Sequence, residues 1–327
     1  MALPDLRDFR SALIVKPSSL GDIVHTLPAV HAIKTAHPHL KLRWIAKPEW
    51  LPLIDGSPDV DEVIPFPQKE FRGVAGAAKA SRWAMQWNKT PREVPEVVLD
   101  FQGLLRSGLI SFARGSRPIL GLSDAREGAS QFYDHIVPVD AGAHAVDRYL
   151  ELPRALGVPV ERVEFPLPEG QPVEQALPAS YVLVHPYSRG AGKSLGHHEL
   201  QVLCDCLTTV PIVVVGMTRQ PQPLRGKHVI DLTNGTSLPQ LIALMRRASV
   251  VVSVDSGPMH IAAAVNDQTL GLHTWSDPRK VGPYNPNAWV WKAGRIAHRG
   301  EFTAEECEQS QPIHEGDARR IADFVMA

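Results

Sequence analysis

SALIVKPSSLGDIVHTL, residues 11–27, has a counterpart later in the chain in SYVLVHPYSRGAGKSLGHHEL, residues 180–200. Each stretch begins with an apolar run typical of a buried strand. Each then continues through a proline and a serine-bearing loop with glycine, and it ends in a helical pattern. A strand followed by a turn and a helix is the repeating unit of α/β proteins. The repetition predicts two similar α/β domains that face each other across a cleft.

Short apolar runs recur along the rest of the chain, and each is followed by a turn and a helical pattern. Runs of this kind, rich in β-branched residues, suit the strands of a parallel sheet that is covered on both faces. The expected strands include residues 13–15, 97–99, 181–184, 212–215 and 250–254. The predicted fold class is therefore α/β, with two Rossmann-like, doubly wound parallel-sheet domains.

A proline-rich polar segment, residues 165–181, separates the two halves and is predicted to be a linker. We therefore place an N-terminal domain at residues 1–165 and a C-terminal domain at residues 166–302. The last segment, residues 303–327, has a helical pattern. One arrangement that we consider packs this segment back on the N-terminal domain.

The bulk composition argues against several classes of protein. The chain has 327 residues and a formal net charge of -1, so no global basic field indicates nucleic acid as a partner. Its three cysteines make no disulfide framework, and its 14 histidines show no metal-ligand spacing. No apolar run approaches the ~18 residues that a membrane span requires. We expect a cytoplasmic protein without a metal, and contact with a membrane surface stays open.

The loop of the first stretch carries one acid, Asp22, where a phosphate-cradling turn would favour cations and bare amides. Ser18, Ser19 and Gly21 precede this acid. A carboxylate at a helix N-terminus is stabilised as the anion and is thereby a weaker base. A catalytic role for Asp22 must therefore come from its position more than from its basicity.

The loop of the second stretch suits a diphosphate. Gly190 and Gly192 let the backbone approach a ligand closely, and Lys193 adds a positive charge. We expect a helix to open near Ser194 and to add its N-terminal amides. The loop is not a Walker A motif, because the residue five positions before Gly192 is Tyr187. A flexible surface loop without a ligand is the alternative interpretation.

A third loop lies within VVVSVDSGPMHIAAAV, where a predicted strand ends and a helix opens at an early proline. The amides of Ser256 and Gly257 would point at an anion, and Asp255 is suited to accept hydrogen bonds from sugar hydroxyls. His260 follows in the first helical turn. A helix cap is the alternative interpretation, and it is compatible with ligand binding. A hydrolase triad is not indicated, because the GxSxG pattern is absent.

Arginines follow the predicted strand at residues 97–99. Arg106, Arg114, Arg117 and Arg126 lie in this part of the chain, and arginine binds phosphate and carboxylate well. Most surface arginines do neither. Arg106 and Arg126 are the stronger candidates because they lie beside glycine-bearing loops.

The segment 68–90 predicts an amphipathic helix or helix-loop. Its apolar face would consist of Phe71, Val74, Ala75, Ala78 and Met85. The segment carries five cations, including Arg72, against one acid, and Trp83 and Trp87 lie four positions apart. A basic, tryptophan-bearing surface suits an anionic lipid headgroup or a phosphorylated glycolipid. A solvated helix with aromatic packing is the alternative.

Four stretches that cover most of the chain resemble one known family. They are PSSLGDIVHTLPAV, LDFQGLLRSG, DLTNGTSLPQLIALMRRASVVVSVDSGPMHIAAAV and SDPRKVGPYNP. Together they resemble the ADP-heptose–lipopolysaccharide heptosyltransferases, inverting glycosyltransferases with two Rossmann-like domains (the GT-B fold). The resemblance implies transfer of a heptose or similar sugar from an ADP-sugar to a lipopolysaccharide-core or related cell-envelope glycan. It implies no cofactor and no metal, and a place in the cytoplasm or at the cytoplasmic face of the inner membrane.

The resemblance also implies roles for particular residues. The family places its catalytic base at the acid after Ser-x-Gly, which is Asp22 here. It assigns the N-terminal domain to a phosphorylated glycolipid or glycan acceptor, and the C-terminal domain to the nucleotide sugar. The positions matched to the acceptor are Ser19, Gly21, Arg72, Arg106 and Arg126. The positions matched to the donor are Ser188, Lys193, Asp255, Ser256, Gly257 and His260.

The chain departs from the family pattern at two places. The loop GMTRQPQPLRG, residues 216–226, lacks the acid that many members offer to the nucleotide ribose. Trp275 lies where the family often has Gly-Pro-Thr-Asp-Pro, and it could reshape the sugar or base pocket. Two alternatives stay open: a sugar-nucleotide epimerase or hydrolase on the same fold, and a catalytically silent protein that binds a nucleotide or glycolipid.

Overall fold

The computed structural model describes residues 3–71, 73–91, 93–190 and 192–327. Two side chains of an expected apolar face, those of Val74 and Ala75, lie outside this description. The chain divides into two compact units, Met1–Pro168 and Glu169–Ala327, and each has its own sheet and its own core. The division falls inside the expected linker, just beyond the boundary expected at residue 165.

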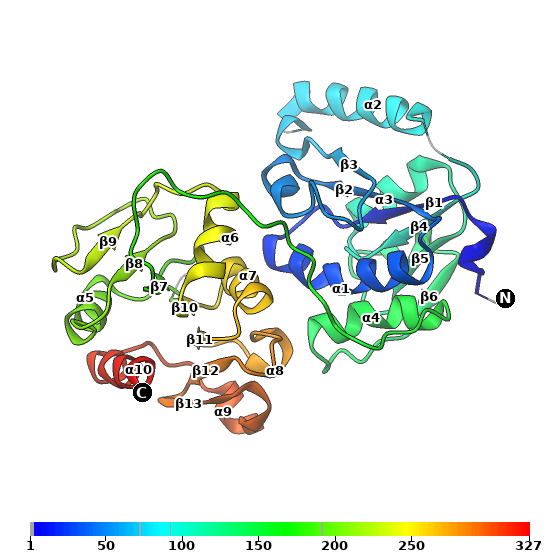
Figure 1. Cartoon of the computed structure of the whole chain (residues 1–327). Helices are drawn as coiled ribbons and strands as arrows, with labels where there is room; N and C mark the ends of the chain where they lie inside the picture. Colours follow the sequence, from blue (N-terminus) through cyan, green and yellow to red (C-terminus); the bar gives the residue numbers. More distant parts are fainter. Residues whose placement is uncertain (1–2, 72, 92, 191) are drawn as a thin grey trace. The chain divides into compact units, whose positions relative to one another are not determined.

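The first unit is built on a six-stranded parallel sheet (Figure 1). Its strands are β1 (Ser11–Val15), β2 (Lys41–Ala46), β3 (Glu62–Pro65), β4 (Glu96–Asp100), β5 (Ile119–Leu122) and β6 (His135–Val137). Their order across the sheet is β3-β2-β1-β4-β5-β6, as in doubly wound dinucleotide-binding folds. The order reverses between β1 and β4, so the loops after these two strands flank the place where such folds bind ligands.

Helices cover both faces of this sheet. They are α1 (Leu20–Ala36), α2 (Gly73–Lys89), α3 (Leu105–Arg114) and α4 (Ala145–Ala155), with 3-10 turns at Leu6–Asp8, Pro48–Leu53, Gln68–Phe71 and Ala129–Phe132. Helix α1 packs against α4, and α2 packs against α3; in Figure 1 the two pairs lie on opposite faces of the sheet. Every residue of β1 and β4 is buried, which explains why most of their sequence is apolar.

The segment 68–90 forms the predicted helix, and Phe71 of its expected apolar face packs against the core, but two other residues of that face do not. Met85 is 65% exposed, and Ala78 is exposed as well. Trp87 is buried instead, and its indole N–H donates to the carbonyl of Ile110 at 3.0 Å. Trp83 stacks on Trp87 with ring centroids 5.3 Å apart. Large indoles bury more apolar area than small side chains do, so the two tryptophans pack inward, as in the alternative with aromatic packing.

The second unit repeats the plan of the first. Its strands are β7 (Val182–His185), β8 (Ile212–Val214), β9 (Val229–Asp231), β10 (Val250–Val254), β11 (Thr269–His273), β12 (Trp289–Lys292) and β13 (Arg295–His298). Their order is β13-β12-β11-β10-β7-β8-β9, and the pairs are parallel except for β12 with β13. Without β13 this is the order of the first sheet, so β7 and β10 correspond to β1 and β4. The predicted repetition of an α/β domain is confirmed.

The helices of the second unit include the C-terminal segment. They are α5 (His197–Cys206), α6 (Leu238–Arg247), α7 (Gly257–Val265), α8 (Pro278–Val281), α9 (Ala304–Glu308) and α10 (Glu315–Met326), with a 3-10 turn at Arg299–Glu301. Helix α10 packs against α5, and its Ile321 and Ala322 are buried in the same core as Leu203. The C-terminal segment is thus part of the second unit. This differs from the arrangement in which it packs back on the N-terminal domain.

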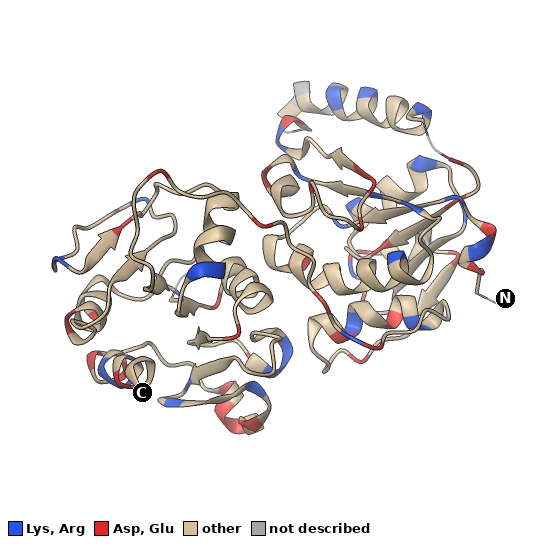
Figure 2. Ribbon diagram, in the orientation of Figure 1, with Lys and Arg blue, Asp and Glu red and all other residues tan. Residues whose placement is uncertain are grey.

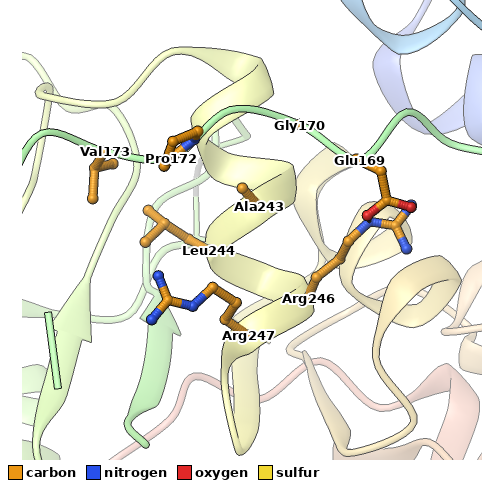
Figure 3. Close-up of a pocket in the computed structure, with 8 residues that line it drawn as sticks. All are labelled: Glu169, Gly170, Pro172, Val173, Ala243, Leu244, Arg246 and Arg247. Atoms are coloured by element: carbon orange, nitrogen blue, oxygen red, sulfur yellow. The ribbon is translucent and has the colours of Figure 1, made fainter. Parts of the chain in front are cut away.

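The linker runs along α6 (Figure 3). The backbone N–H of Gln171 donates to the carbonyl of Pro239 at 3.0 Å. Gly170 has a φ of +83°, and a Cβ there would lie 2.4 Å from the same carbonyl oxygen, so this close approach requires glycine. A cavity of about 280 Å³ lies between the linker and α6. At its edge the Arg246 guanidinium lies 3.8 Å from the Glu169 carboxylate.

Candidate active site

A cavity of about 380 Å³ opens at the carboxyl ends of β1, β4 and β5 in the first unit. Its lining consists of Lys16, Asp22, Asp100, Phe101, Gln102, Gly103, Leu122, Asp124, Arg126, Arg148 and Tyr149. The segments at and after the ends of the three strands supply most of this lining, and α1 and α4 supply the rest. The cavity therefore lies where the strand order reverses, which is the usual ligand position in such a fold.

Asp22 lies in the first turn of α1, three residues after the N-cap residue Ser19. Its Oδ2 accepts hydrogen bonds from the backbone N–H of Ser19 at 2.9 Å and from the Ser19 hydroxyl at 2.7 Å. An acid at this position satisfies a backbone donor at the helix start and complements the helix dipole. Oδ1 remains turned to the cavity-lining Tyr149, whose hydroxyl lies 3.4 Å away. One oxygen is thus anchored, and the other faces groups of the cavity.

Lys16 lies behind Asp22 and is fully buried. Its ammonium donates to the carbonyl of Phe101 at 2.8 Å and to the Tyr149 hydroxyl at 2.6 Å. Burial lowers the pKa of Lys16, while the nearby Asp22 carboxylate opposes that shift. Burial likewise raises the pKa of Tyr149, so its hydroxyl stays protonated. Tyr149 thereby accepts from Lys16 and donates toward Asp22, which links the buried cation to the acid.

The remaining wall of the cavity is strongly charged, with three cations and three carboxyl side chains in the lining. Arg148 forms an ion pair with Asp124, and both side chains are about three-quarters buried. Arg126 is exposed, and its backbone N–H donates to the carbonyl of Gly103 at 2.7 Å, which ties the loop after β5 to the loop after β4. Because its side chain is exposed in the lining, Arg126 is the cation that best suits an anionic sugar substituent such as a phosphate or carboxylate.

Asp100 shapes the loop after β4. It accepts hydrogen bonds from the backbone N–H groups of Gln102 at 2.9 Å and Gly103 at 3.2 Å. The Tyr133 hydroxyl donates to its other oxygen at 3.0 Å. Burial raises the pKa of Asp100 in spite of these donors. This carboxyl group is occupied by the protein itself, which leaves Asp22 as the better placed acid for chemistry.

The predicted acceptor residues do not all lie at the cavity. Arg126 lines the cavity. Ser19 and Gly21 lie just before Asp22 at the start of α1. Arg106 is exposed in the first turn of α3 and is not part of the lining. Arg72 lies outside the described residues.

Two weaker arginine candidates have structural roles. Arg114 is fully buried against Glu96 at 2.8 Å, and Arg117 pairs with Asp134 at 2.8 Å. Sequence reasoning missed Lys16, Arg148 and Tyr149. Lys16 was detectable in principle, because it follows β1 directly. The two residues of α4 carry no such signal, since only folding brings that helix to the first loop.

In the second unit, Lys193 and Asp255 meet from loops that are 62 positions apart in the chain. The lysine Nζ lies 2.5 Å from Oδ2 of Asp255, and the Ser276 hydroxyl donates to the same oxygen at 2.5 Å. His273 contacts Ser276 through its Nδ1 at 2.9 Å. The Lys193 ammonium also lies over the Trp275 ring, 4.3 Å from its centroid. The loops after β7, β10 and β11 thus form one polar network.

The charges of this network are fixed by burial and by partners. Burial alone would raise the pKa of Asp255, but nearby His273 and the hydrogen bonds from Lys193 and Ser276 hold that pKa below its ordinary value. Burial lowers the pKa of His273 to about 4, so its imidazole is neutral near pH 7. The network therefore consists of a carboxylate, an ammonium and neutral donors.

The other predicted donor residues lie on the same loops. Ser256 is the N-cap residue of α7, and Gly257 begins that helix, as predicted. His260 is buried one turn further on. The Ser188 hydroxyl accepts from the backbone N–H of Gly190 at 3.3 Å, which folds the loop after β7 on itself.

The helix predicted to open near Ser194 begins later, at His197 with Gly196 as its N-cap residue. Leu195 causes the delay: its backbone N–H bonds to the carbonyl of Pro186 at 2.9 Å, and its side chain is buried in the core. Lys193 therefore lies in the loop and not at the helix N-terminus.

Metal-ligand clusters and membrane-spanning helices are absent from the part of the chain that the structure describes. No group there of three or more His, Cys, Asp or Glu side chains is placed to hold a metal ion. Every described helix is too short or too polar to span a lipid bilayer. Cys204, Cys206 and Cys307 are free thiols.

The fold is shared with a solved heptosyltransferase. The structure matches Escherichia coli heptosyltransferase WaaC with ADP at a TM-score of 0.73 and 23% sequence identity, over 97% of this chain and 99% of that one. Two Rossmann-like units in one chain and this match define the GT-B fold.

Two relatives of similar sequence and a family model show to which protein family the chain belongs. The chain is 29% identical to lipopolysaccharide heptosyltransferase 1 of Pseudomonas aeruginosa over 83% of this chain and 81% of that protein. It is 27% identical to the Escherichia coli K12 protein of the same name, over 86% and 93%. The family model described as glycosyltransferase family 9 (heptosyltransferase) matches residues 89–191 and 217–310. The chain belongs to glycosyltransferase family 9.

Proposed function

We propose that this enzyme transfers a heptose from an ADP-sugar to the inner core of lipopolysaccharide, with inversion at the anomeric carbon and with Asp22 as general base. The carrying observation is the environment of Asp22: one carboxylate oxygen is anchored, and the other faces Tyr149 in a cavity at the carboxyl ends of the strands. The names of the curated relatives support the lipopolysaccharide acceptor, and the ADP in the similar solved structure supports the nucleotide. The comparisons do not favour an epimerase, a hydrolase or a silent binding protein.

In this proposal the first unit holds the acceptor. Arg126 is exposed in the cavity lining and suits an anionic group of a phosphorylated or acidic sugar. The attacking hydroxyl would lie at Oδ1 of Asp22. The carboxylate accepts the hydroxyl proton as the oxygen forms its bond to the anomeric carbon from the face opposite the leaving group. Attack from that face inverts the configuration.

The second unit would hold the donor. The bond between the anomeric carbon and the diphosphate oxygen breaks with both electrons going to oxygen, so negative charge grows on the leaving ADP. Lys193 and the amides at the N-terminus of α7, beside Ser256 and Gly257, are the groups that meet this charge. Asp255 already holds the Lys193 ammonium in place, so the cation is positioned before the diphosphate arrives. Asp255 and His260 would then contact the sugar.

The proposed place of action is the cytoplasm, at the face of the inner membrane. Three free thiols agree with a reducing compartment. A nucleotide sugar is a water-soluble donor, whereas a lipopolysaccharide precursor carries its core sugar on a lipid anchor. The reaction we propose therefore joins a dissolved substrate to one that lies at a membrane surface.

Replacement of Asp22 by asparagine tests the base. The asparagine side chain would keep an oxygen for the Ser19 N–H and would preserve the shape of the loop, but it cannot accept the proton. For D22N we expect transfer from ADP-heptose to a lipopolysaccharide-core acceptor to fall by on the order of 10²–10⁴. ADP binding, measured by calorimetry, should not change, because the donor site that we propose lies in the other unit. Near-normal turnover in D22N would remove Asp22 from the base role.

A further inference from the structure

We propose that the outer surface of the α2–α3 layer docks on an anionic lipid bilayer, with the exposed apolar stripe of α3 inserted among the headgroups. This surface is defined by Leu105, Leu109 and Phe112 on α3 and by Lys79, Arg82 and Lys89 on α2. The proposal goes beyond the transfer reaction and does not depend on which glycan accepts the sugar.

The apolar part of the surface is a helical stripe that the fold leaves uncovered. Leu105, Leu109 and Phe112 are spaced four and three positions apart, so they share one face of α3. They are 43%, 50% and 54% exposed, while Ile110 on the other face is buried in the core. Large apolar side chains aligned on an exposed helix face are typical of surfaces that bind a partner or a membrane.

The charge of the surface indicates which partner it suits. The sequences of α2 and α3 contain no aspartate or glutamate, and Figure 2 shows blue bands and no red along α2. Lys79, Arg82 and Lys89 of α2 are exposed, as is Arg106 of α3. Lys79 has one acid neighbour, Glu70 at 3.6 Å, and such an exposed pair is weak. The acid next to the stripe is Glu127, which accepts from the backbone N–H of its first residue, Leu105. Exposed cations on two packed helices together with an apolar stripe match the headgroups of anionic lipids and the acyl region beneath them.

The surface is also continuous with the cavity of the first unit. Gln102 and Gly103 line the cavity, and the chain passes through Leu104 directly into α3. The backbone N–H of Leu105 donates to Glu127, the neighbour of the cavity residue Arg126, at 3.3 Å. The exposed stripe therefore begins beside the cavity mouth. A lipid-anchored substrate in a membrane held by this stripe would present its sugars next to the cavity.

Vesicle binding by the full chain tests the proposal. We expect co-sedimentation with phosphatidylcholine vesicles that contain about 30 mol% phosphatidylglycerol, and little with pure phosphatidylcholine. Raising the salt from about 0.05 M to about 0.5 M should weaken the binding, since exposed charges are screened. The double variant L109D/F112D should lose at least about tenfold in vesicle affinity. The control M217D alters a side chain that is 81% exposed in the second unit and should bind as the parent does.

A second pair of variants tests the proposal even if L109D/F112D fails to fold. L109W places a reporter in the stripe, and M217W places one outside it. Brominated phosphatidylglycerol vesicles should quench the fluorescence added by L109W and leave that added by M217W unchanged. The proposal is overturned if neither the parent nor L109W responds to anionic vesicles. It is also overturned if light scattering shows a dimer that L109D/F112D abolishes, because the stripe then binds a second copy of the chain. These readouts do not involve sugar transfer, so they stand apart from the test of Asp22.

Discussion

Asp22 has two roles that a single carboxylate can combine. One oxygen accepts two hydrogen bonds from Ser19 and completes the start of α1, while the other is directed toward Tyr149 in the cavity. The anchored oxygen leaves the acid little rotational freedom, and positioning of this kind contributes to catalysis.

Tyr149 is predicted to position Asp22. Y149F removes the hydroxyl that accepts from Lys16 and donates toward Asp22, and it leaves the buried ammonium with the Phe101 carbonyl. We expect a loss of about 1–3 kcal/mol in unfolding free energy. We also expect kcat to fall about tenfold with a shifted pH profile, and KM for the donor to stay constant. Urea unfolding and initial-rate kinetics measure both effects.

The control for this variant is Y181F in the second unit. The Tyr181 hydroxyl donates to the carbonyl of Leu244 at 2.8 Å, so its removal should cost stability without changing the pH profile of transfer. If Y149F behaves in the same way as Y181F, Tyr149 is a structural residue only.

At the scale of secondary-structure elements, buried ion pairs join strands to helices in the first unit. Glu96 at the start of β4 has no exposed side-chain area, and it accepts from Arg43 of β2 at 3.1 Å and from Arg114 of α3 at 2.8 Å. The Ser116 hydroxyl adds a bond of 2.6 Å. This acid therefore holds α3, and with it the exposed stripe, against the sheet. Arg114 was one of the cations that sequence reasoning considered for a ligand, and its burial explains why it is unavailable.

Substitution of Glu96 by glutamine should destabilise the first unit strongly. E96Q leaves two arginines without their shared buried partner, and we expect a loss of about 3–5 kcal/mol in unfolding free energy. E62Q is the matched control, because Glu62 also binds Arg43 but is 40% exposed, and it should cost less than about 1 kcal/mol. Similar losses in the two variants would contradict the importance of the buried pair. Chemical denaturation followed by circular dichroism provides the measurement.

The ionisation of Glu96 should also contribute to the pH dependence of the free energy of unfolding. Burial opposes ionisation, but the bonds from Arg114 and Ser116 and the charge of Arg43 hold the pKa of Glu96 below its ordinary value of 4.5. A depressed pKa contributes stability that is fully present above 4.5 and is lost as the pH falls through the lower, folded-state value. E96Q should flatten this acid limb of the stability profile. An unchanged acid limb would show that other groups control it.

At the scale of the whole molecule, the chain consists of two units with separate cores and equivalent strand orders. Equivalent loops carry different chemistry in the two units. The loop after β1 presents the acid Asp22, and the loop after β7 presents the cation Lys193. A base suits an acceptor hydroxyl, and a cation suits a diphosphate, so in the proposed reaction each unit would bind one of the two substrates.

ADP should protect the second unit alone. At about 100 times its Kd, a ligand adds about 2.7 kcal/mol to the stability of the unit that binds it. Hydrogen exchange with and without ADP should show protection in residues 186–196, 254–260 and 273–277. K193A should weaken ADP binding at least about tenfold, whereas K227A, which alters an exposed lysine of the same unit, should not. Protection confined to the first unit would reverse the assignment of donor and acceptor.

By itself, the sequence determined the features that depend on local pattern. Continuous apolar runs predicted the parallel strands, the repeated strand–loop–helix plan predicted two similar domains, and the order of motifs identified the family. Asp22 was recognisable because it opens a helix, Asp255 because it directly follows a strand, and Lys193 because it lies in a glycine-bearing loop. The local pattern of segment 68–90 did not decide which face turns inward: Met85 was placed on the apolar face but is exposed, and Trp87, left open between a surface and aromatic packing, is buried.

Only the tertiary structure decided which distant residues meet. Tyr149 lies 127 positions from Asp22 and 133 from Lys16, yet it contacts both, because α4 packs on α1. Packing also decided that Arg114 is buried, that α3 leaves an apolar stripe exposed, and that the C-terminal helix joins the second unit. The physical reason is the same in each case: burial and pairing are properties of surfaces brought together by folding, and those surfaces do not exist in the extended chain.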